Sequence, residues 1–182
     1  MITMVELEKI IKSRKSMSAM ELDELLQSCP EWVAQNAARE AKRATAEAQF
    51  RIEEEPIIAD LALAGFEVGS VWDLVNTNER YPSAIPVLLK HLTKAYHVRI
   101  REGIIRALTT PEARGLAAGA ILAELHKEED SELRWALANA LTVVADQGNA
   151  VAIKVLLDDP ACEDVSERLG EALKTSGSAL RS

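Results

Sequence analysis

Apolar residues recur at helical spacing in three related segments of the second half of the chain. The first copy is IREGIIRALT, which begins at Ile100; the second is LRWALANALT, which begins thirty-three residues later at Leu133; a looser third copy is VSERLGEALK, from Val165. In each copy the apolar positions lie three or four residues apart, so they share one face of a helix. Each segment is therefore predicted to be a helix that needs a partner to cover that face.

A second set of apolar segments precedes these three copies. They are AIPVLLKHL from Ala84, AAGAILAEL from Ala117 and AVAIKVLL from Ala150, and their starts are also thirty-three residues apart. Two helices in each repeat of about 33 to 47 residues are typical of an α-solenoid. We therefore predict three helix pairs, over residues 83–93 with 96–109, 112–127 with 131–145, and 149–158 with 162–175.

Residues 1–82 are predicted to form an N-terminal helical cap. Two short helices are expected over residues 3–15 and from about residue 20 to 28, the second opened by the Ser-x-x-Glu capping box at Ser18. Residues 31–55 contain many alanines and neither Gly nor Pro, which predicts one long helix whose interleaved basic side chains form a solvated face. Pro56 is expected to end it and to open a separate short helix.

Two shorter features complete the prediction of a single helical domain over residues 1–182. Ser70 is placed to cap a helix of one or two turns that begins at Val71. Residues 176–182 have too little apolar content to pack, so we expect a frayed tail.

Composition favours the same all-α class. Hydrophobic residues make up 48% of the chain but aromatic residues only 4%, which suits closely packed helices better than β-sheets. No apolar run approaches the ~20 residues that cross a bilayer, and the start MITMVELEKI lacks the apolar core of a signal peptide. Cys29 and Cys162 are far apart and have no clustered histidines. We therefore expect a cytoplasmic protein with no membrane association, no metal and no cofactor.

The charge of the chain bears on its partners. The formal net charge is −8, and from Pro111 onward thirteen acidic residues face seven basic ones. Proteins bind nucleic acid mainly by neutralising phosphates with cations, so nucleic acid is not the expected ligand. A basic protein would be steered toward such a surface.

The helix pairs resemble HEAT repeats. The run from Ala84 to Leu89 is similar to the Ala-Ile-Pro-x-Leu-Leu of a first HEAT helix, and the segments that begin at Ile100 and Leu133 are similar to the Val-Arg-x-x-Ala-x-x-Ala-Leu of a second helix. The third copy departs from this pattern, because Ser166 stands where the Arg would be. The resemblance covers residues 83–175 and implies an α-α superhelix, a HEAT/armadillo-like solenoid.

A finer resemblance concerns the segment SVWDLVNT from Ser70, followed by RYPSAIPVLLKHL and IREGIIRAL. It is similar to small bacterial HEAT-repeat proteins, some of which are immunity proteins of toxin systems such as contact-dependent growth inhibition. The resemblance implies a non-enzymatic protein that neutralises a cognate toxin, for example a basic nuclease domain, by occluding its active site or substrate surface. The alternative is a general adaptor for a cellular protein. A HEAT-like lyase or a DNA-repair glycosylase is a further option, and the glycosylase would need a basic groove.

Candidate contact residues lie in a polar and aromatic loop group, on the second helices and in one acidic run. They are Trp72, Asp73, Asn76, Tyr81, Glu102, Arg106, Glu128, Glu129, Asp130, Trp135 and Asn139. Trp135 is either a wedge between repeats or an anchor for a partner, and Trp72 is either a core residue or a contact residue. Which face of the solenoid binds is left open.

Other polar residues are predicted to have structural roles. Arg101 and Arg134 occupy equivalent positions, and we expect them to form an internal ladder with acids such as Glu102 or Asp130. His91 is expected on the polar face of its helix, and His97 at the start of the next helix. The chain contains no Walker-type glycine loop, G-x-S-x-G or H-E-x-x-H motif, so no catalytic residue is nominated.

Overall fold

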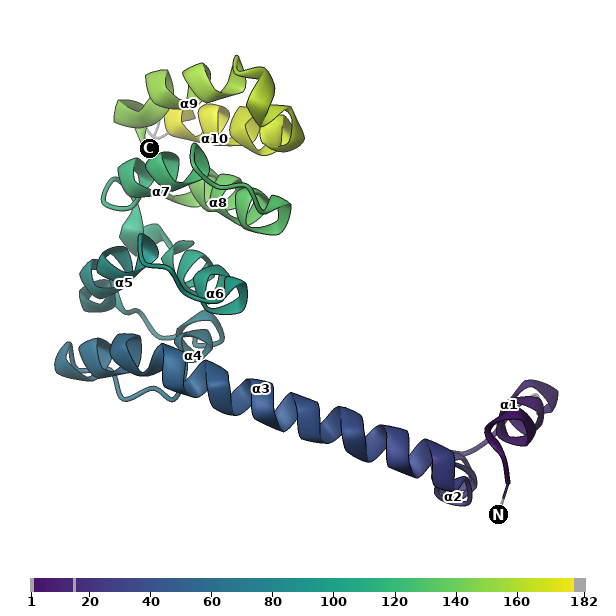
Figure 1. Ribbon diagram of the computed structural model, residues 1–182. Helices are drawn as coiled ribbons and strands as arrows, with labels where there is room; N and C mark the ends of the chain where they lie inside the picture. Colours follow the sequence, from purple (N-terminus) through teal and green to yellow (C-terminus); the bar gives the residue numbers. More distant parts are fainter. Residues whose placement is uncertain (1, 15, 179–182) are drawn as a thin grey trace. The chain divides into compact units, whose positions relative to one another are not determined.

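Helices are the only regular secondary structure in the part of the chain that the computed structural model describes, residues 2–14 and 16–178 (Figure 1). The all-α prediction is therefore confirmed. Internal contacts divide the chain into two compact units, Met1–Gln49 and Phe50–Ser182. We refer to them as the first unit and the second unit.

The first unit contains α1 (Met4–Ser13), α2 (Ala19–Gln27) and the beginning of α3 (Pro30–Leu63). Both short helices begin with a capping box, formed by Thr3 with Glu6 in α1 and by Ser18 with Glu21 in α2. The box predicted at Ser18 is thus confirmed. Among the described residues of this unit, the buried apolar side chains are Leu7 and Cys29.

Helix α3 continues through Pro56, so the prediction that it ends at residue 55 and that a separate helix follows was wrong. Proline removes one backbone donor and is unfavourable inside a helix by about 3 kcal/mol. Ile57 and Leu61, which follow it, are completely buried in the core of the second unit, and this packing stabilises the helix beyond the proline. Tertiary contacts therefore outweigh the local helix breaker.

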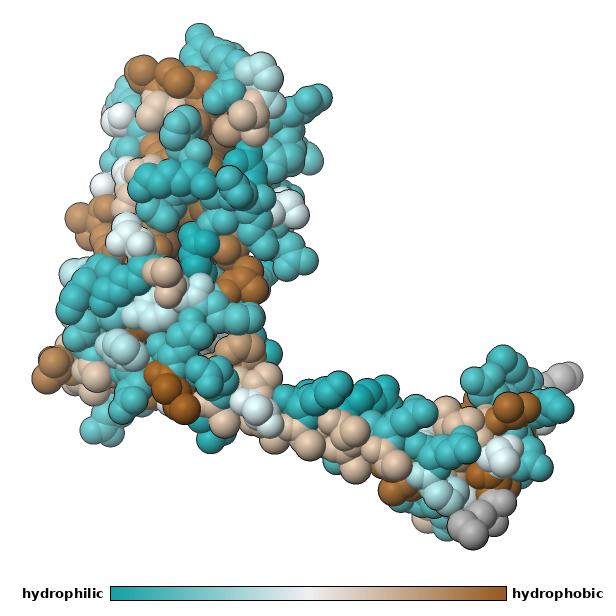
Figure 2. All heavy atoms as spheres, in the orientation of Figure 1, coloured by the Kyte–Doolittle hydropathy of each residue, from teal (hydrophilic) through white to brown (hydrophobic). Residues whose placement is uncertain are grey.

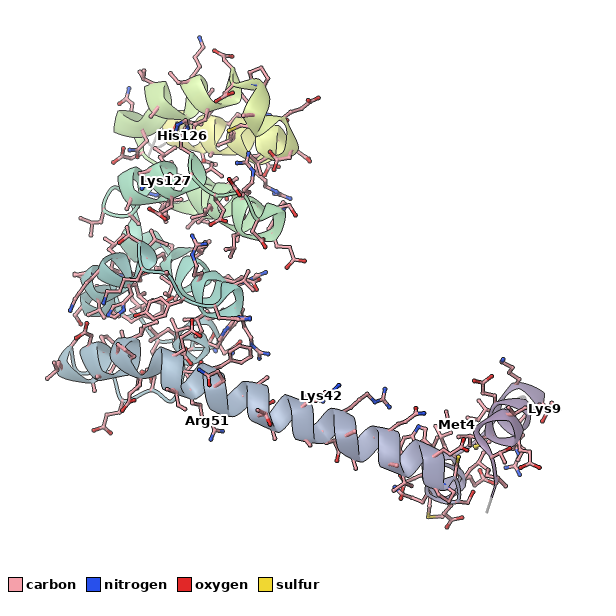
Figure 3. All side chains as sticks on the ribbon, viewed as in Figure 1. Met4, Lys9, Lys42, Arg51, His126 and Lys127 are labelled. Atoms are coloured by element: carbon pink, nitrogen blue, oxygen red, sulfur yellow. The ribbon has the colours of Figure 1, made fainter. Side chains whose placement is uncertain are left out.

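The charged part of α3 is solvated, as predicted. Residues 37–49 are all exposed, and Lys42 and Arg51 project from the ribbon in Figure 3. Figure 2 shows teal, hydrophilic positions interleaved with paler small residues along this helix. The helix thus buries little apolar area over these residues.

The second unit contains a short helix followed by three helix pairs. The short helix is α4 (Val71–Val75), capped by Ser70 as predicted. The pairs are α5 (Ile85–Leu92) with α6 (Val98–Leu108), α7 (Ala118–Leu125) with α8 (Ser131–Val144), and α9 (Ala150–Leu157) with α10 (Ser166–Ser178). Short 3-10 turns introduce the pairs and α10: η1 (Pro82–Ala84), η2 (Pro111–Ala113), η3 (Gln147–Asn149) and η4 (Pro160–Val165).

The second helices of the three pairs pack side by side. Helix α6 contacts α4 on one side and α8 on the other, and α8 contacts α10, as Figure 1 shows. The apolar positions that defined the three related segments are buried, among them Ile104, Leu137 and Leu169, and they belong to one continuous core. The thirty-three-residue repeat in the sequence therefore corresponds to equivalent helices that contact one another.

Several other helix boundaries differ from the predictions; for example, α10 begins at Ser166 instead of residue 162, because η4 precedes it. Helix α7 begins at Ala118 instead of residue 112, because Gly115 adopts a positive φ of 75° and its N–H donates to the carbonyl of Val144. Helix α10 continues to Ser178, and the Ser176 side chain is 1% exposed, so the frayed tail predicted from residue 176 was wrong for residues 176–178. The remainder of that tail, residues 179–182, lies outside the described residues.

Candidate functional site

Trp135 lies near the start of α8, the helix that packs between α6 and α10. Its side chain is 42% exposed, although it belongs to a helix whose other large apolar residues are mostly buried. The guanidinium carbon of Arg168, from α10, lies 5.4 Å from the centre of the indole ring. Arg168 in turn donates to Glu171 over 2.6 Å. The ring is thus held between two helices while part of it still faces solvent.

A cavity of about 330 Å³ opens beside this ring, between α6 and α8. Its lining combines two residues of α6 with three from the first turns of α8: Glu102, Arg106, Ser131, Glu132 and Trp135. Arg106 donates from Nε to the Glu102 carboxylate over 2.7 Å. We call this hollow the α6–α8 cavity. Three of the nominated contact residues, Glu102, Arg106 and Trp135, therefore come together, and Asn139 lies one helical turn after Trp135.

Arg101 and Arg134 form the internal ladder that was predicted, but with different acids. Nη2 of Arg101 lies 2.6 Å from Glu128, and Arg134 makes two hydrogen bonds of 2.8 Å to the Asp164 carboxylate. Both acids stand just before the second helix of the following pair, so each Arg joins neighbouring pairs. The bonds from Arg134 hold the pKa of Asp164 below its usual value. The expectation that Glu102 or Asp130 would be the partner was wrong.

The acidic run from Glu128 to Asp130 has mainly structural roles. The Glu128 side chain is 8% exposed and paired with Arg101. Asp130 caps α8 by accepting hydrogen bonds from the backbone N–H groups of Glu132 and Leu133. Glu129 is exposed and lines a shallow hollow of about 580 Å³ next to Arg134. A charge change at Glu128 or Asp130 would therefore disturb the fold as well as any contact.

Trp72 and Tyr81, from the loop group, hold the second unit together. The half-buried Trp72 ring packs against Gly103 of α6, where an added Cβ would lie 3.0 Å from its Nε1. Tyr81 is buried, and its hydroxyl donates to the carbonyl of Ala107. Burial raises the pKa of this phenol. For Trp72, the packing matches the core alternative that the sequence left open.

The two polar members of the loop group complete local hydrogen bonds. Asp73 accepts from the backbone N–H groups of Gly69 and Ser70, and Asn76 donates to the carbonyl of Trp72. Asp73 and Tyr81 also line a cavity of about 360 Å³ beside Arg80. This second cavity is separate from the α6–α8 cavity in its lining residues.

No protein-family model, no curated protein and no solved structure matches the chain. The proposal for its function consequently depends on its own surface chemistry. The α6–α8 cavity combines an exposed aromatic ring, two carboxylates and a guanidinium.

Sequence reasoning missed a buried polar cluster around His91. Its side chain is 0% exposed, so the prediction that it lies on a polar helix face was wrong. Nε2 lies 2.7 Å from Asp60 of α3, and Nδ1 lies 2.6 Å from the hydroxyl of Tyr96. Lys90 also donates to Asp60 over 2.6 Å. Asp60 stands thirty-one residues before His91, and no local pattern in the sequence links them.

The charges of this cluster follow from its burial and its hydrogen bonds. Bonds from Lys90 and His91 lower the pKa of Asp60 to about 2, and burial lowers the pKa of His91. His97 lies at the start of α6, as predicted, where its Nδ1 accepts from the backbone N–H of Arg99. The cluster joins α3 to α5 and is closed to solvent at the imidazole, so we assign it a structural role.

Metal binding and membrane insertion both require local features that can be recognised in the described part of the chain. No group of three or more His, Cys, Asp or Glu side chains there is arranged to bind a metal ion. None of the helices in residues 2–14 and 16–178 combines the length and the apolar character needed to span a membrane.

Proposed function

We propose that residues 83–175 form a HEAT-type solenoid whose second helices bind a protein partner. Two observations support the solenoid: equivalent helices thirty-three residues apart pack side by side, and Arg101 and Arg134 join successive pairs in the same way. In repeat proteins such stacking produces an extended surface for binding other macromolecules.

The observation that carries the binding proposal is the exposure of Trp135 beside the α6–α8 cavity. Trp is among the residues that contribute most at protein interfaces, and hot spots sit where an aromatic ring is surrounded by groups that exclude water. Arg168 holds the ring in place, so little side-chain entropy remains to be lost when a partner covers it.

We further propose that the partner is a basic toxin domain and that this chain is its immunity protein in the cytoplasm. The resemblance described above and the net charge of −8 support this choice. The acidic surface would speed capture of a basic toxin, and burial of Trp135 would slow its release. Inhibition would result from occlusion of the toxin's active site or substrate surface, and this chain would perform no chemistry.

The test is co-purification with candidate basic toxin domains, beginning with any product of a neighbouring gene, followed by affinity measurements. Trp135→Ala should raise the dissociation constant by roughly 30-fold to 1,000-fold, the range that corresponds to about 2–4 kcal/mol for a hot spot. Val151→Ala is the matched control, because Val151 is also exposed but lies on α9, a first helix. It should leave the affinity unchanged.

Other outcomes would redirect or end the proposal. Binding of a cellular protein through Trp135, with no effect of gene loss on sensitivity to toxin, would identify an adaptor instead. If Val151→Ala weakens binding and Trp135→Ala does not, the surface of α6, α8 and α10 is not the binding surface.

A further inference from the structure

The α6–α8 cavity carries a negative charge that the protein itself does not neutralise. Its lining contains two carboxylates, Glu102 and Glu132, and one guanidinium, Arg106, which bonds to Glu102. Glu132 is exposed, and within residues 2–14 and 16–178 no basic side chain forms an ion pair with it. The cavity is therefore matched in charge to a single cation.

The aromatic wall of the cavity indicates which kind of cation fits. The Arg168 guanidinium carbon lies 5.4 Å from the centre of the Trp135 ring, and Trp135 also lines the cavity. A guanidinium is planar, stacks on aromatic faces and donates two parallel hydrogen bonds to a carboxylate. A lysine ammonium lacks that fork and is more strongly hydrated. Arginine suits this combination of ring and carboxylate better.

We infer that the α6–α8 cavity binds an arginine side chain of the protein partner, with its guanidinium against Trp135 and hydrogen-bonded to Glu132. Ser131 lines the same cavity and offers a hydroxyl acceptor for a remaining N–H group. The inference rests on the proposed protein-binding function, because it names the contact that the partner makes on this surface. It adds a specificity: the partner presents arginine there.

The experiment uses the full chain and a capped tripeptide, acetyl-Gly-Arg-Gly-amide, as the probe. The indole N–H resonance of Trp135, assigned by its disappearance in Trp135→Phe, reports binding at the cavity during a titration. Because an exposed cation–π contact and an exposed ion pair are each weak, saturation is expected in the millimolar range. The citrulline analogue has nearly the same shape without the charge and should not shift the resonance.

Matched variants separate a specific site from general attraction to an acidic surface. Glu132→Gln should weaken binding of the arginine probe at least several-fold. Glu129→Gln removes the same charge three residues away, outside the lining of the cavity, and should have no such effect. Thermal unfolding of both variants checks that the fold is retained, as expected for exposed side chains.

The inference is overturned if the probe does not shift the Trp135 resonance, if citrulline shifts it equally, or if Glu129→Gln weakens binding as much as Glu132→Gln. Failure of the proposed function is distinct. If the arginine probe binds specifically but binding of the partner does not depend on Trp135, the arginine site is supported and the proposed protein-binding surface is rejected. If binding of the partner depends on Trp135 but the arginine probe does not bind, the proposed protein-binding surface is supported and the arginine site is rejected.

Discussion

At the scale of single residues, Arg134 makes a dense set of contacts between helix pairs. Its guanidinium donates to both oxygens of Asp164 and to the carbonyls of Glu128 and Ala161, and its side chain is only 12% exposed. Substitution by an apolar residue of similar length would leave these acceptors without their donor. We expect Arg134→Met to lower the free energy of unfolding by about 2–3 kcal/mol, as measured by urea denaturation.

Arg106→Met is the control for this prediction. Arg106 bonds to Glu102 one turn away in the same helix, and both side chains are substantially exposed. Exposed pairs of this kind contribute about 0.3–0.5 kcal/mol. Equal losses of stability in the two variants would show that Arg134 does not join the pairs as described.

The His91 cluster predicts a dependence of stability on pH. Burial lowers the pKa of His91 below its ordinary value of 6.5 in the folded chain, so the unfolded chain binds more protons as pH falls below 6.5. Stability is therefore complete above this pH and decreases as pH falls toward the lower folded pKa. One such group changes the free energy of unfolding by at most about 1.4 kcal/mol per pH unit.

His91→Gln tests this origin, because glutamine retains polar atoms but does not titrate. Urea denaturation at about pH 7.5 and about pH 5 should show a smaller loss of stability in this variant than in the unaltered chain. His126→Gln, which removes an exposed histidine outside this cluster, is the matched control. The pKa of Asp60, lowered to about 2, affects stability only at still lower pH, below its ordinary value of 3.8.

At the scale of elements, the contact between α4 and α6 depends on the absence of one side chain. A Cβ at Gly103 would lie 2.6 Å from Val71 and 3.0 Å from Nε1 of Trp72. Gly103→Ala should therefore lower the free energy of unfolding by about 1–2 kcal/mol, even though alanine favours helices by about 1 kcal/mol. Gly170→Ala in α10 meets no atom within 4 Å and should raise stability by about 0.5–1 kcal/mol. Thermal unfolding measures both; equal shifts would contradict the close approach.

The elements also show which parts of the fold local sequence can specify. The three helix pairs were predicted because their apolar spacing repeats, and the caps at Ser18 and Ser70 because capping is a local hydrogen-bond pattern. The continuity of α3 through Pro56 was missed because it depends on burial of Ile57 against residues far along the chain. Long-range packing decided that boundary.

The residues of the candidate site also fall into those that the sequence could predict and those that it could not. Glu102, Arg106 and Trp135 could be grouped from the sequence because equivalent positions of neighbouring repeats must lie close together. Glu132 was missed because its interest as a contact residue lies in two features of the folded chain: it lines the cavity, and no basic side chain of the described residues forms an ion pair with it. Arg168 was missed because its position over the Trp135 ring depends on how α10 packs on α8. Periodicity predicts which residues lie close together, but the direction and pairing of their side chains depend on tertiary packing.

At the scale of the whole molecule, the two units differ sharply in how much apolar surface they bury. In the described part of the first unit, Leu7 and Cys29 are the buried apolar residues, whereas the second unit has one continuous core extending from Ile57 to Ala172. Residues 37–49 of α3 are exposed throughout. The other helices of the first unit, α1 and α2, are short, and short helices gain most of their stability from packing. The first unit should therefore open more readily than the second.

Hydrogen exchange on the full chain tests this difference. Backbone amides of α1, α2 and residues 37–49 of α3 should exchange through low-energy openings, and those of α6 and α8 only through unfolding of the second unit. Leu137→Ala should lower protection in α8 by about 2–5 kcal/mol, since it creates a cavity in the core. Leu7→Ala should affect α1 and α2 alone. If Leu7→Ala lowers protection of α8 to the same extent, the two units unfold as one, and the small core around Leu7 stabilises more of the chain than its burial predicts.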